Sequence, residues 1–149
     1  MGKEVSQNSV PLIGAWRLTS FIRKTDDEVI YPFGENAQGS LIYTETGRFS
    51  GQVMRSDRPQ FVSEDLMKGT AEEIEANYKG FISYYGRYEF DGENGIVVHH
   101  VEGSLFPNWE GQPQKRFFDL SGSQLKLTTE PILWGGGEIV AVLLWERIE

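Results

Sequence analysis

The chain has 149 residues, a formal net charge of −8 and no cysteine. This length is typical of one domain that buries a core without metals or disulfides. The negative charge argues against a nucleic-acid partner, because such a surface repels phosphates. The absence of cysteine excludes a disulfide scaffold, a thiolate metal site and a cysteine nucleophile.

No segment of the sequence has an apolar run long enough for a signal peptide or a membrane span. We therefore expect a cytoplasmic protein with no membrane partner. Residues 1–10 are polar and predict a flexible N-terminal segment, and residues 11–148 predict one domain. Nothing in the sequence decides between a monomer and a homodimer.

Alternating apolar and polar residues predict the first strand, which follows Pro11. The expected inward positions are Trp16, Leu18, Ser20 and Ile22. Residues 40–43 and 48–54 then predict a hairpin around Gly47, since two β-rich runs are joined by a short glycine-containing link.

Residues 63–81 form the one stretch with a helical pattern. Thr70 and Glu73 have the spacing of a capping box, in which each side chain satisfies a free backbone amide of the other residue. Apolar residues recur on one helical face at Ile74, Tyr78 and Phe81. We expect this face to cover the final strand or to form a lid.

Further short strands separated by turns are predicted over residues 82–90, 96–104, 114–120, 125–129 and 139–148. Regular strands with short turns favour an antiparallel meander that closes on itself. The predicted fold is therefore all-β: an eight- to nine-stranded up-and-down antiparallel β-barrel with a helical insertion around residues 63–81. Eight strands leave an interior wide enough for side chains or one small ligand.

The two histidines, His99 and His100, are adjacent in a predicted strand and must point to opposite faces. Glu102 shares a face with His100, so these two side chains are a candidate catalytic acid–base pair. Alternatively, one histidine lies on the surface and the other is hydrogen-bonded in the core. Two histidines on opposite faces cannot hold one ion, so we expect no metal and no cofactor.

Several other side chains are candidates for ligand contact. Tyr84 and Tyr88 present two phenols on one face, and Arg116 is a basic group on an otherwise apolar face, where it would meet an anion or form a salt bridge with Glu102. An aromatic loop, Phe106–Trp109, is a gate or a plug. The full set of candidate ligand-binding residues is Gln52, Tyr84, Tyr88, His99, Trp109, Arg116 and Trp145.

Several segments together resemble the bacterial and fungal lipocalin-like domain family of small calycin-type barrels. They are Leu12–Leu18 with its Gly-x-Trp, Gln52–Arg55, Tyr85–Tyr88, His99–Ser104 and Leu144–Arg147. The resemblance implies a closed barrel whose cup binds a small, largely apolar molecule. It also implies that Arg147 packs over Trp16 and closes the barrel floor. Some lipocalin-like barrels have become cyclases or isomerases of secondary metabolites.

Three functions are consistent with these features. The first is binding of a small hydrophobic or aromatic molecule in the cavity. The second is cofactor-free catalysis, such as cyclisation, isomerisation or dehydration, by His100 and Glu102 with Tyr88 or Arg116 opposite. The third is a packed structural barrel without a ligand.

Overall fold

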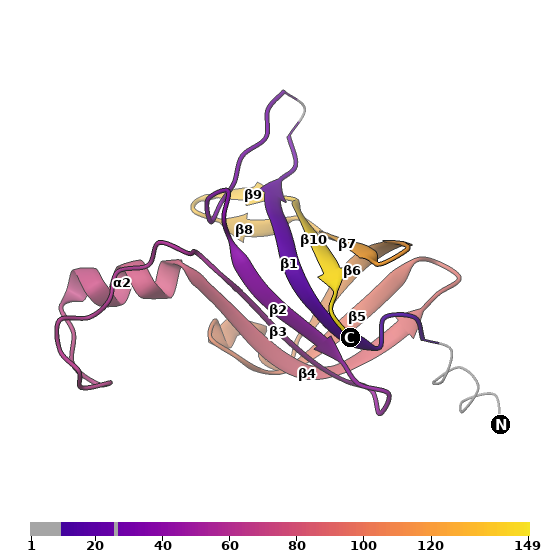
Figure 1. The fold of residues 1–149 in the computed structure, drawn as a ribbon, viewed down its shortest axis with the longest axis horizontal. Helices are drawn as coiled ribbons and strands as arrows, with labels where there is room; N and C mark the ends of the chain where they lie inside the picture. Colours follow the sequence, from indigo (N-terminus) through magenta and orange to yellow (C-terminus); the bar gives the residue numbers. More distant parts are fainter. Residues whose placement is uncertain (1–9, 26) are drawn as a thin grey trace.

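The computed structural model describes residues 10–25 and 27–149. Eight strands close into a barrel in the order β1-β10-β7-β6-β5-β4-β3-β2 (Figure 1). Their bounds are β1 Gly14–Arg23, β2 Gln38–Tyr43, β3 Arg48–Met54, β4 Phe81–Asp91, β5 Ile96–Ser104, β6 Pro113–Ser121, β7 Gln124–Thr129 and β10 Ala141–Arg147. The remaining elements are helix α2 Ala71–Lys79, the short 3-10 helix η1 Pro107–Trp109, and a separate hairpin of β8 Ile132–Trp134 and β9 Gly137–Ile139.

Every neighbouring pair in the barrel is antiparallel, and β1 pairs with both β2 and β10 to close it. Strands that follow one another along the chain lie side by side, except that β10 joins β7 after the β8–β9 hairpin. The predicted all-β, up-and-down barrel is therefore confirmed. The alternation of apolar and polar residues predicted most strand positions correctly, because one face of each strand lines the interior.

Strand β1 departs from simple alternation. Its pairing with β10 shifts register between Leu18 and Ser20, which is the mark of a β-bulge. After the bulge Phe21, not Ile22, points inward and is buried. The predicted inward set was therefore wrong beyond Leu18, because one extra residue flips the face of everything that follows.

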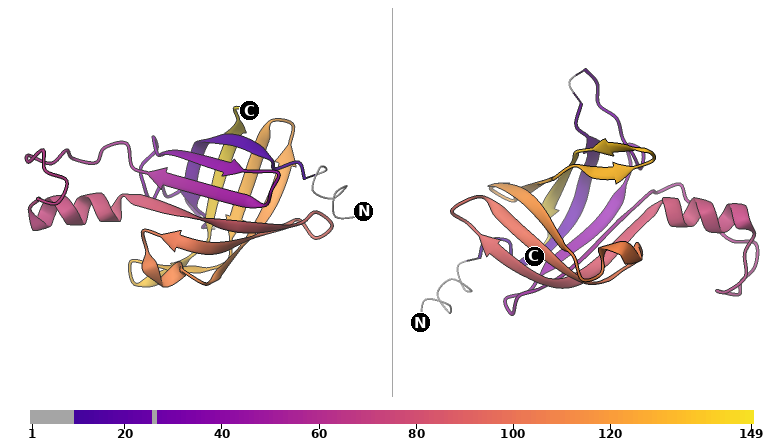
Figure 2. Two further views of the ribbon diagram at one scale, coloured as in Figure 1. Left: turned by 90° about the horizontal axis from the view of Figure 1, so that it is seen from below. Right: turned by 180° about the vertical axis from the view of Figure 1, so that it is seen from behind.

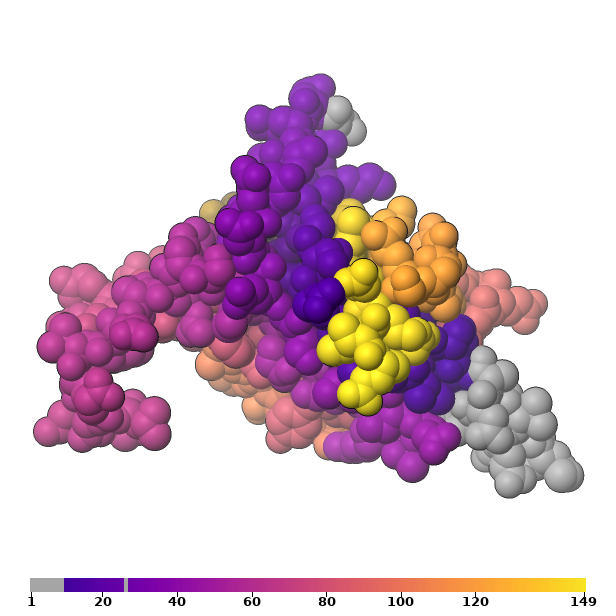
Figure 3. Space-filling view, in the orientation of Figure 1, coloured from indigo at the N-terminus to yellow at the C-terminus, as the bar shows by residue number. Residues whose placement is uncertain are grey.

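Helix α2 is shorter than predicted and packs differently. Its capping box of Thr70 and Glu73 is present as expected, but residues 63–70 do not form helix. None of its side chains is buried. With the segment before it, α2 extends away from the barrel as an arm, defined here as residues 55–80 (Figures 1 and 3). The arm does not cover β10, so the first of its two expected roles was wrong, and the role of a lid stays a prediction.

The two ends of the barrel differ. Four long connections, residues 24–37, 55–80, 105–112 and 130–140, leave from the same end, here called the mouth. The other end, the floor, has only the tight turns 44–47, 92–95 and 122–123 together with the start of β1 and the end of β10 (Figure 2). The mouth thus carries every loop long enough to shape a binding site.

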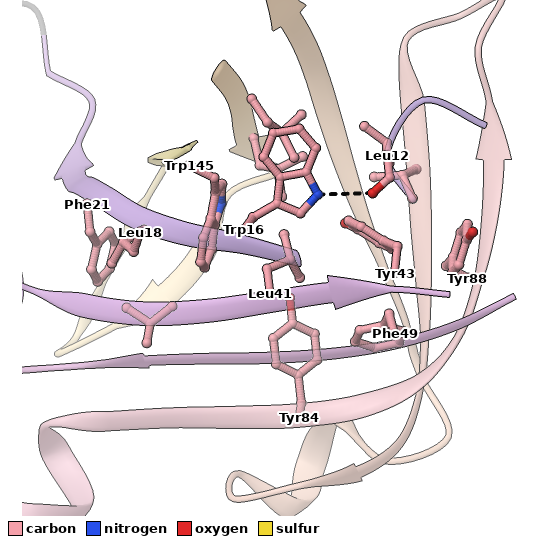
Figure 4. Packing of buried hydrophobic residues seen from close by; sticks show 14 of the residues in the cluster. Leu12, Trp16, Leu18, Phe21, Leu41, Tyr43, Phe49, Tyr84, Tyr88 and Trp145 are labelled. Carbon is pink, nitrogen blue, oxygen red and sulfur yellow. Dashed lines mark hydrogen bonds between the residues drawn. The ribbon is translucent and has the colours of Figure 1, made fainter. Parts of the chain in front are cut away.

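The floor is closed by aromatic packing. The Arg147 guanidinium lies 4.3 Å from the centre of the Trp16 ring, and its Nη1 donates to the Ile13 carbonyl at 2.8 Å. Trp16 Nε1 donates to the Leu12 carbonyl at 3.0 Å (Figure 4). Val10 is buried too, so the core begins inside the stretch predicted to be flexible, while residues 1–9 lie outside the described part.

Across residues 10–25 and 27–149, α2 and η1 are both too short to cross a bilayer as helices.

Candidate ligand cavity

A partly enclosed cavity lies inside the barrel. Its free volume is about 60 Å³. On a comparable measure one water needs roughly 10–15 Å³, so the space holds a few waters and expands for a ligand only if side chains move. The lining comes from all eight barrel strands, η1 and β8: Phe21, Leu41, Gly51, Val53, Ile82, Tyr84, His99, Trp109, Arg116, Leu127, Thr129, Ile132, Trp134, Ala141, Leu143 and Trp145.

The cavity occupies only part of the interior. Aromatic side chains fill the rest towards the floor, where the Tyr43 and Tyr88 rings meet edge to face with centres 4.9 Å apart (Figure 4). Trp109 from η1 and Trp134 from β8 line the mouth side, and Trp134 packs against Phe21 and Phe33. A ligand would therefore enter between the mouth connections and stop against a packed floor.

His99 is the most buried polar group of the cavity wall, with no exposed surface. Its Nε2 lies 2.7 Å from the Tyr43 hydroxyl and its Nδ1 lies 3.0 Å from the Tyr84 hydroxyl. Phe49 stacks on the imidazole at 4.3 Å between ring centres. Both ring nitrogens are thus satisfied by phenols, and the ring is held between neighbouring strands.

Burial sets the charge state of this cluster. Desolvation, together with the positive charges of Arg116 and His100, holds the pKa of His99 well below its usual value. Desolvation also raises the pKa of Tyr43 well above its usual value. At neutral pH the His99 imidazole is therefore neutral and the Tyr43 phenol is protonated.

Arg116 is a buried cation on the wall, 6% exposed. Its Nη1 donates to the Lys115 carbonyl at 3.1 Å. Within the described part of the chain no carboxylate lies within salt-bridge distance of this guanidinium. The predicted salt bridge to Glu102 is absent there, because Glu102 lies on the other side of the barrel wall.

Trp145 is a further lining residue with a polar atom. Its Nε1 is buried and has no hydrogen-bond partner among the described residues. Its ring lines the cavity together with Leu143 of the same strand. A buried donor without a partner is costly, and a ligand oxygen in the cavity would relieve that cost.

The structure brings five of the seven candidate ligand-binding residues to the cavity: Tyr84, His99, Trp109, Arg116 and Trp145. Tyr88 is buried nearer the floor, where its hydroxyl donates to the Thr44 carbonyl at 2.7 Å. Gln52 points outwards, and its Nε2 donates to the Ser50 hydroxyl. Strand β3 turns Phe49, Gly51 and Val53 inwards instead.

His100 and Glu102 do not line the cavity. Both lie on the outer face of β5, where His100 Nε2 is 2.5 Å from a Glu89 oxygen. Glu102 accepts two hydrogen bonds from Arg48, at 2.8 and 2.9 Å, and these lower its pKa. The expectation that the two face the cavity as an acid–base pair was wrong, because the β5 register turns Val97, His99 and Val101 inwards.

Some cavity residues were not singled out from the sequence. Trp134 and Ile132 belong to the β8–β9 hairpin, whose turn contains Gly135 and Gly136, both with positive φ. A glycine-rich turn flanked by apolar residues was the available signal for this hairpin. The approach of Tyr43 to His99 had no sequence signal, since it depends on which strands become neighbours.

A wider hollow of about 740 Å³ lies outside the barrel, between the arm and strands β4 and β5. It is open to solvent and includes charged groups such as Arg58 and Glu110. The interior cavity is much smaller, but it is more enclosed, mostly apolar and lined by aromatic rings. Enclosure and few convergent polar groups are the usual features of small-molecule sites, so we take the interior cavity as the candidate site.

A closed eight-stranded barrel with a cavity behind its mouth loops and an Arg-over-Trp floor is the architecture of a lipocalin-type binding protein. The chain belongs to the lipocalin-like domain family, whose model matches residues 13–148. It is similar to the 4′-hydroxy-3′-methoxypropiophenone carrier protein of Aspergillus oryzae. The two are 34% identical over 106 residues, which is 66% of this chain and 96% of that protein.

Proposed function

We propose that this protein is a carrier that binds one small, largely apolar aromatic molecule in the barrel cavity. The observation that carries the proposal is the partly enclosed cavity itself, which is walled by aromatic and aliphatic side chains and reached from the loop-bearing mouth. Membership of the lipocalin-like family and similarity to a protein named as the carrier of an aromatic ketone support it. The proposed ligand belongs to the same chemical class, a single substituted aromatic ring.

The catalytic alternative has less support. Its two proposed groups, His100 and Glu102, lie on the outer surface with partners of their own. The histidine that does reach the cavity has both nitrogens hydrogen-bonded. With its pKa well below the usual value, His99 is a weak base, which is poorly suited to accepting a proton at neutral pH.

Filling the cavity tests the carrier proposal. A Cβ on Gly51 would lie 3.4 Å from Leu41 Cδ1 and 3.6 Å from Tyr84 Cε1, which is ordinary van der Waals contact. Gly51→Val therefore places two methyl groups in the cavity without backbone overlap, and valine suits a strand. We expect binding of 4′-hydroxy-3′-methoxypropiophenone, measured by calorimetry, to weaken at least about tenfold, the equivalent of roughly 1.4 kcal/mol.

The matched control is Gln52→Val, the next residue on β3, whose side chain points outwards. It should leave binding unchanged. The proposal fails if the unmodified protein binds no small aromatic molecule, or if Gly51→Val and Gln52→Val bind equally well while both remain folded. A cytoplasmic location and a monomeric or homodimeric state stay predictions, and light scattering tests the second.

A further inference from the structure

The polar atoms that face the cavity can be assigned as donors or acceptors by following the hydroxyl proton of Tyr43. This phenol is fully buried, and its hydroxyl has one partner among the described residues, His99 Nε2. If Nε2 carried the imidazole proton, the Tyr43 proton would have no acceptor. An unsatisfied buried donor costs about 1–3 kcal/mol. Tyr43 therefore donates to Nε2.

This assignment determines the tautomer of His99 and the direction of its second hydrogen bond. A neutral imidazole that accepts at Nε2 carries its proton at Nδ1. Nδ1–H then donates to the Tyr84 oxygen, 3.0 Å away. The proton of the Tyr84 hydroxyl is left without a partner in the described protein, on a residue that lines the cavity.

Two further donors belong to residues that line the same cavity. Trp145 Nε1–H is buried and unpaired, and Arg116 carries a guanidinium whose described hydrogen bonds use only Nη1. Neither aspartate nor glutamate is among the described lining residues. The single Thr129 hydroxyl oxygen already accepts from the Ala141 amide at 3.0 Å. The cavity thus offers donors and one positive charge, and the protein supplies almost no acceptor.

We propose that the cavity takes its aromatic ligand as an oxyanion, with an ionised phenol, enolate or carboxylate oxygen paired to Arg116 and the Tyr84 and Trp145 donors. This rests on the proposed carrier function and specifies its ligand class. A buried cation is costly without a counter-charge, and a ligand oxyanion supplies one. A guanidinium also binds such oxygens in two-point geometry, which orients the ring.

The test uses 4-nitrophenol, whose phenol and phenolate forms absorb at different wavelengths, and 4-nitrotoluene, a neutral molecule of similar shape. Binding of 4-nitrophenol is followed by absorbance across pH, and that of 4-nitrotoluene by calorimetry. We expect the phenolate to bind at least about tenfold more tightly than 4-nitrotoluene. We also expect the bound 4-nitrophenol to titrate about one pH unit or more below the free probe.

Variants assign the effect to the cavity donors. Arg116→Met should weaken binding of the phenolate at least about tenfold more than binding of 4-nitrotoluene, and Arg116→Lys should restore part of the difference. Tyr84→Phe should reduce the preference by a smaller factor. Arg48→Met, which removes one positive charge from the outer surface, is the matched control and should change neither probe.

Each outcome decides one proposal. If neither probe binds the folded protein, the carrier function itself fails. If both probes bind equally and the titration of 4-nitrophenol is unshifted, the carrier function stands and the oxyanion inference is overturned. The inference is also overturned if Arg48→Met lowers the phenolate preference as much as Arg116→Met, because the effect would then be one of overall charge. Melting curves of each variant establish that it is folded.

Discussion

At the scale of single residues, the imidazole of His99 is the centre of the polar contacts in the cavity wall. His99 is enclosed by Tyr43, Tyr84 and Phe49, with the Arg116 charge nearby. Alternation along a strand predicts that His99 and His100 face opposite ways. It does not predict which of them faces inwards, because the residues that share a face with His99 and those that share a face with His100 both include apolar side chains. The register of β5 against β4 and β6 made that choice.

The buried imidazole predicts a dependence of stability on pH. Because the folded pKa of His99 lies well below the unfolded value of about 6.5, the unfolded chain takes up a proton first as the pH falls. This contribution to stability is complete above about pH 7. Below about pH 6.5 the free energy of unfolding should decrease by up to about 1.4 kcal/mol per pH unit, until the folded pKa is reached.

Urea unfolding at several pH values between about 5 and 7.5 measures this slope. His99→Gln should flatten it, whereas His100→Gln, which changes the neighbouring surface histidine, should preserve the part that belongs to His99. An unchanged slope in His99→Gln would show that another group is responsible. The carboxylates with lowered pKa, Asp57, Glu73 and Glu102, contribute only at more acidic pH.

At the scale of elements, the barrel strands could be predicted from the sequence pattern more fully than the arm. Strands that share an apolar face with the core were predictable because burial enforces the period of two. The position of the arm was not predictable in this way, although the capping box at the start of its helix was recognised in the sequence. Its apolar residues include Val62 and Leu66, which are 92% and 93% exposed, so hydrophobicity alone did not bring this segment onto the barrel (Figure 3).

Two glycines on the β4–β5 pair should differ in how much stability the protein loses when each is replaced by alanine. A methyl group on Gly86 would overlap the backbone carbonyl oxygen of His100 and approach the Glu102 amide, at the register shift in β4. On Gly103 it would meet only the ring of Tyr85, a half-exposed side chain that can rotate. We expect Gly86→Ala to lower the free energy of unfolding by about 2 kcal/mol or more, and Gly103→Ala by less than about 1 kcal/mol.

Chemical denaturation of both variants compares the same substitution on facing strands. Equal losses would contradict this account, since one neighbour is backbone and the other is a mobile side chain.

At the scale of the whole molecule, the two ends of the barrel differ, and we expect ligand binding to affect them differently. All four long connections lie at the mouth, and the start of β1, the end of β10 and the tight turns lie at the floor (Figure 2). The cavity reaches the mouth through Trp109 and Trp134 and stops at packed aromatics. Ligand binding should therefore reduce the motion of the mouth connections and leave that of the floor turns unchanged.

Hydrogen exchange with and without saturating 4-nitrophenol measures this difference. We expect added protection for amides of residues 105–112 and 130–140, and little change in the floor turns 44–47 and 122–123. Gly51→Val provides the control, because a filled cavity should remove the protection. Protection of the floor turns alone would place the ligand elsewhere.

The sequence by itself determined the all-β class, most strand positions and the closure of the barrel. It did so because local alternation and turn residues report directly on which side of a strand is buried. It also carried the Gly-x-Trp and terminal arginine that become the floor, and the inward face of β6 that places Arg116 inside.

Tertiary structure decided the rest. The bulge in β1 and the exclusion of His100 and Glu102 from the cavity depend on the register of strand pairing. The meeting of Tyr43 with His99 depends on barrel closure, and the outward projection of the arm is seen only in the folded molecule. A shift of one residue in pairing reverses which side chains face the ligand. Local sequence patterns do not encode that shift, so the chemistry of the cavity becomes visible only once the barrel has closed.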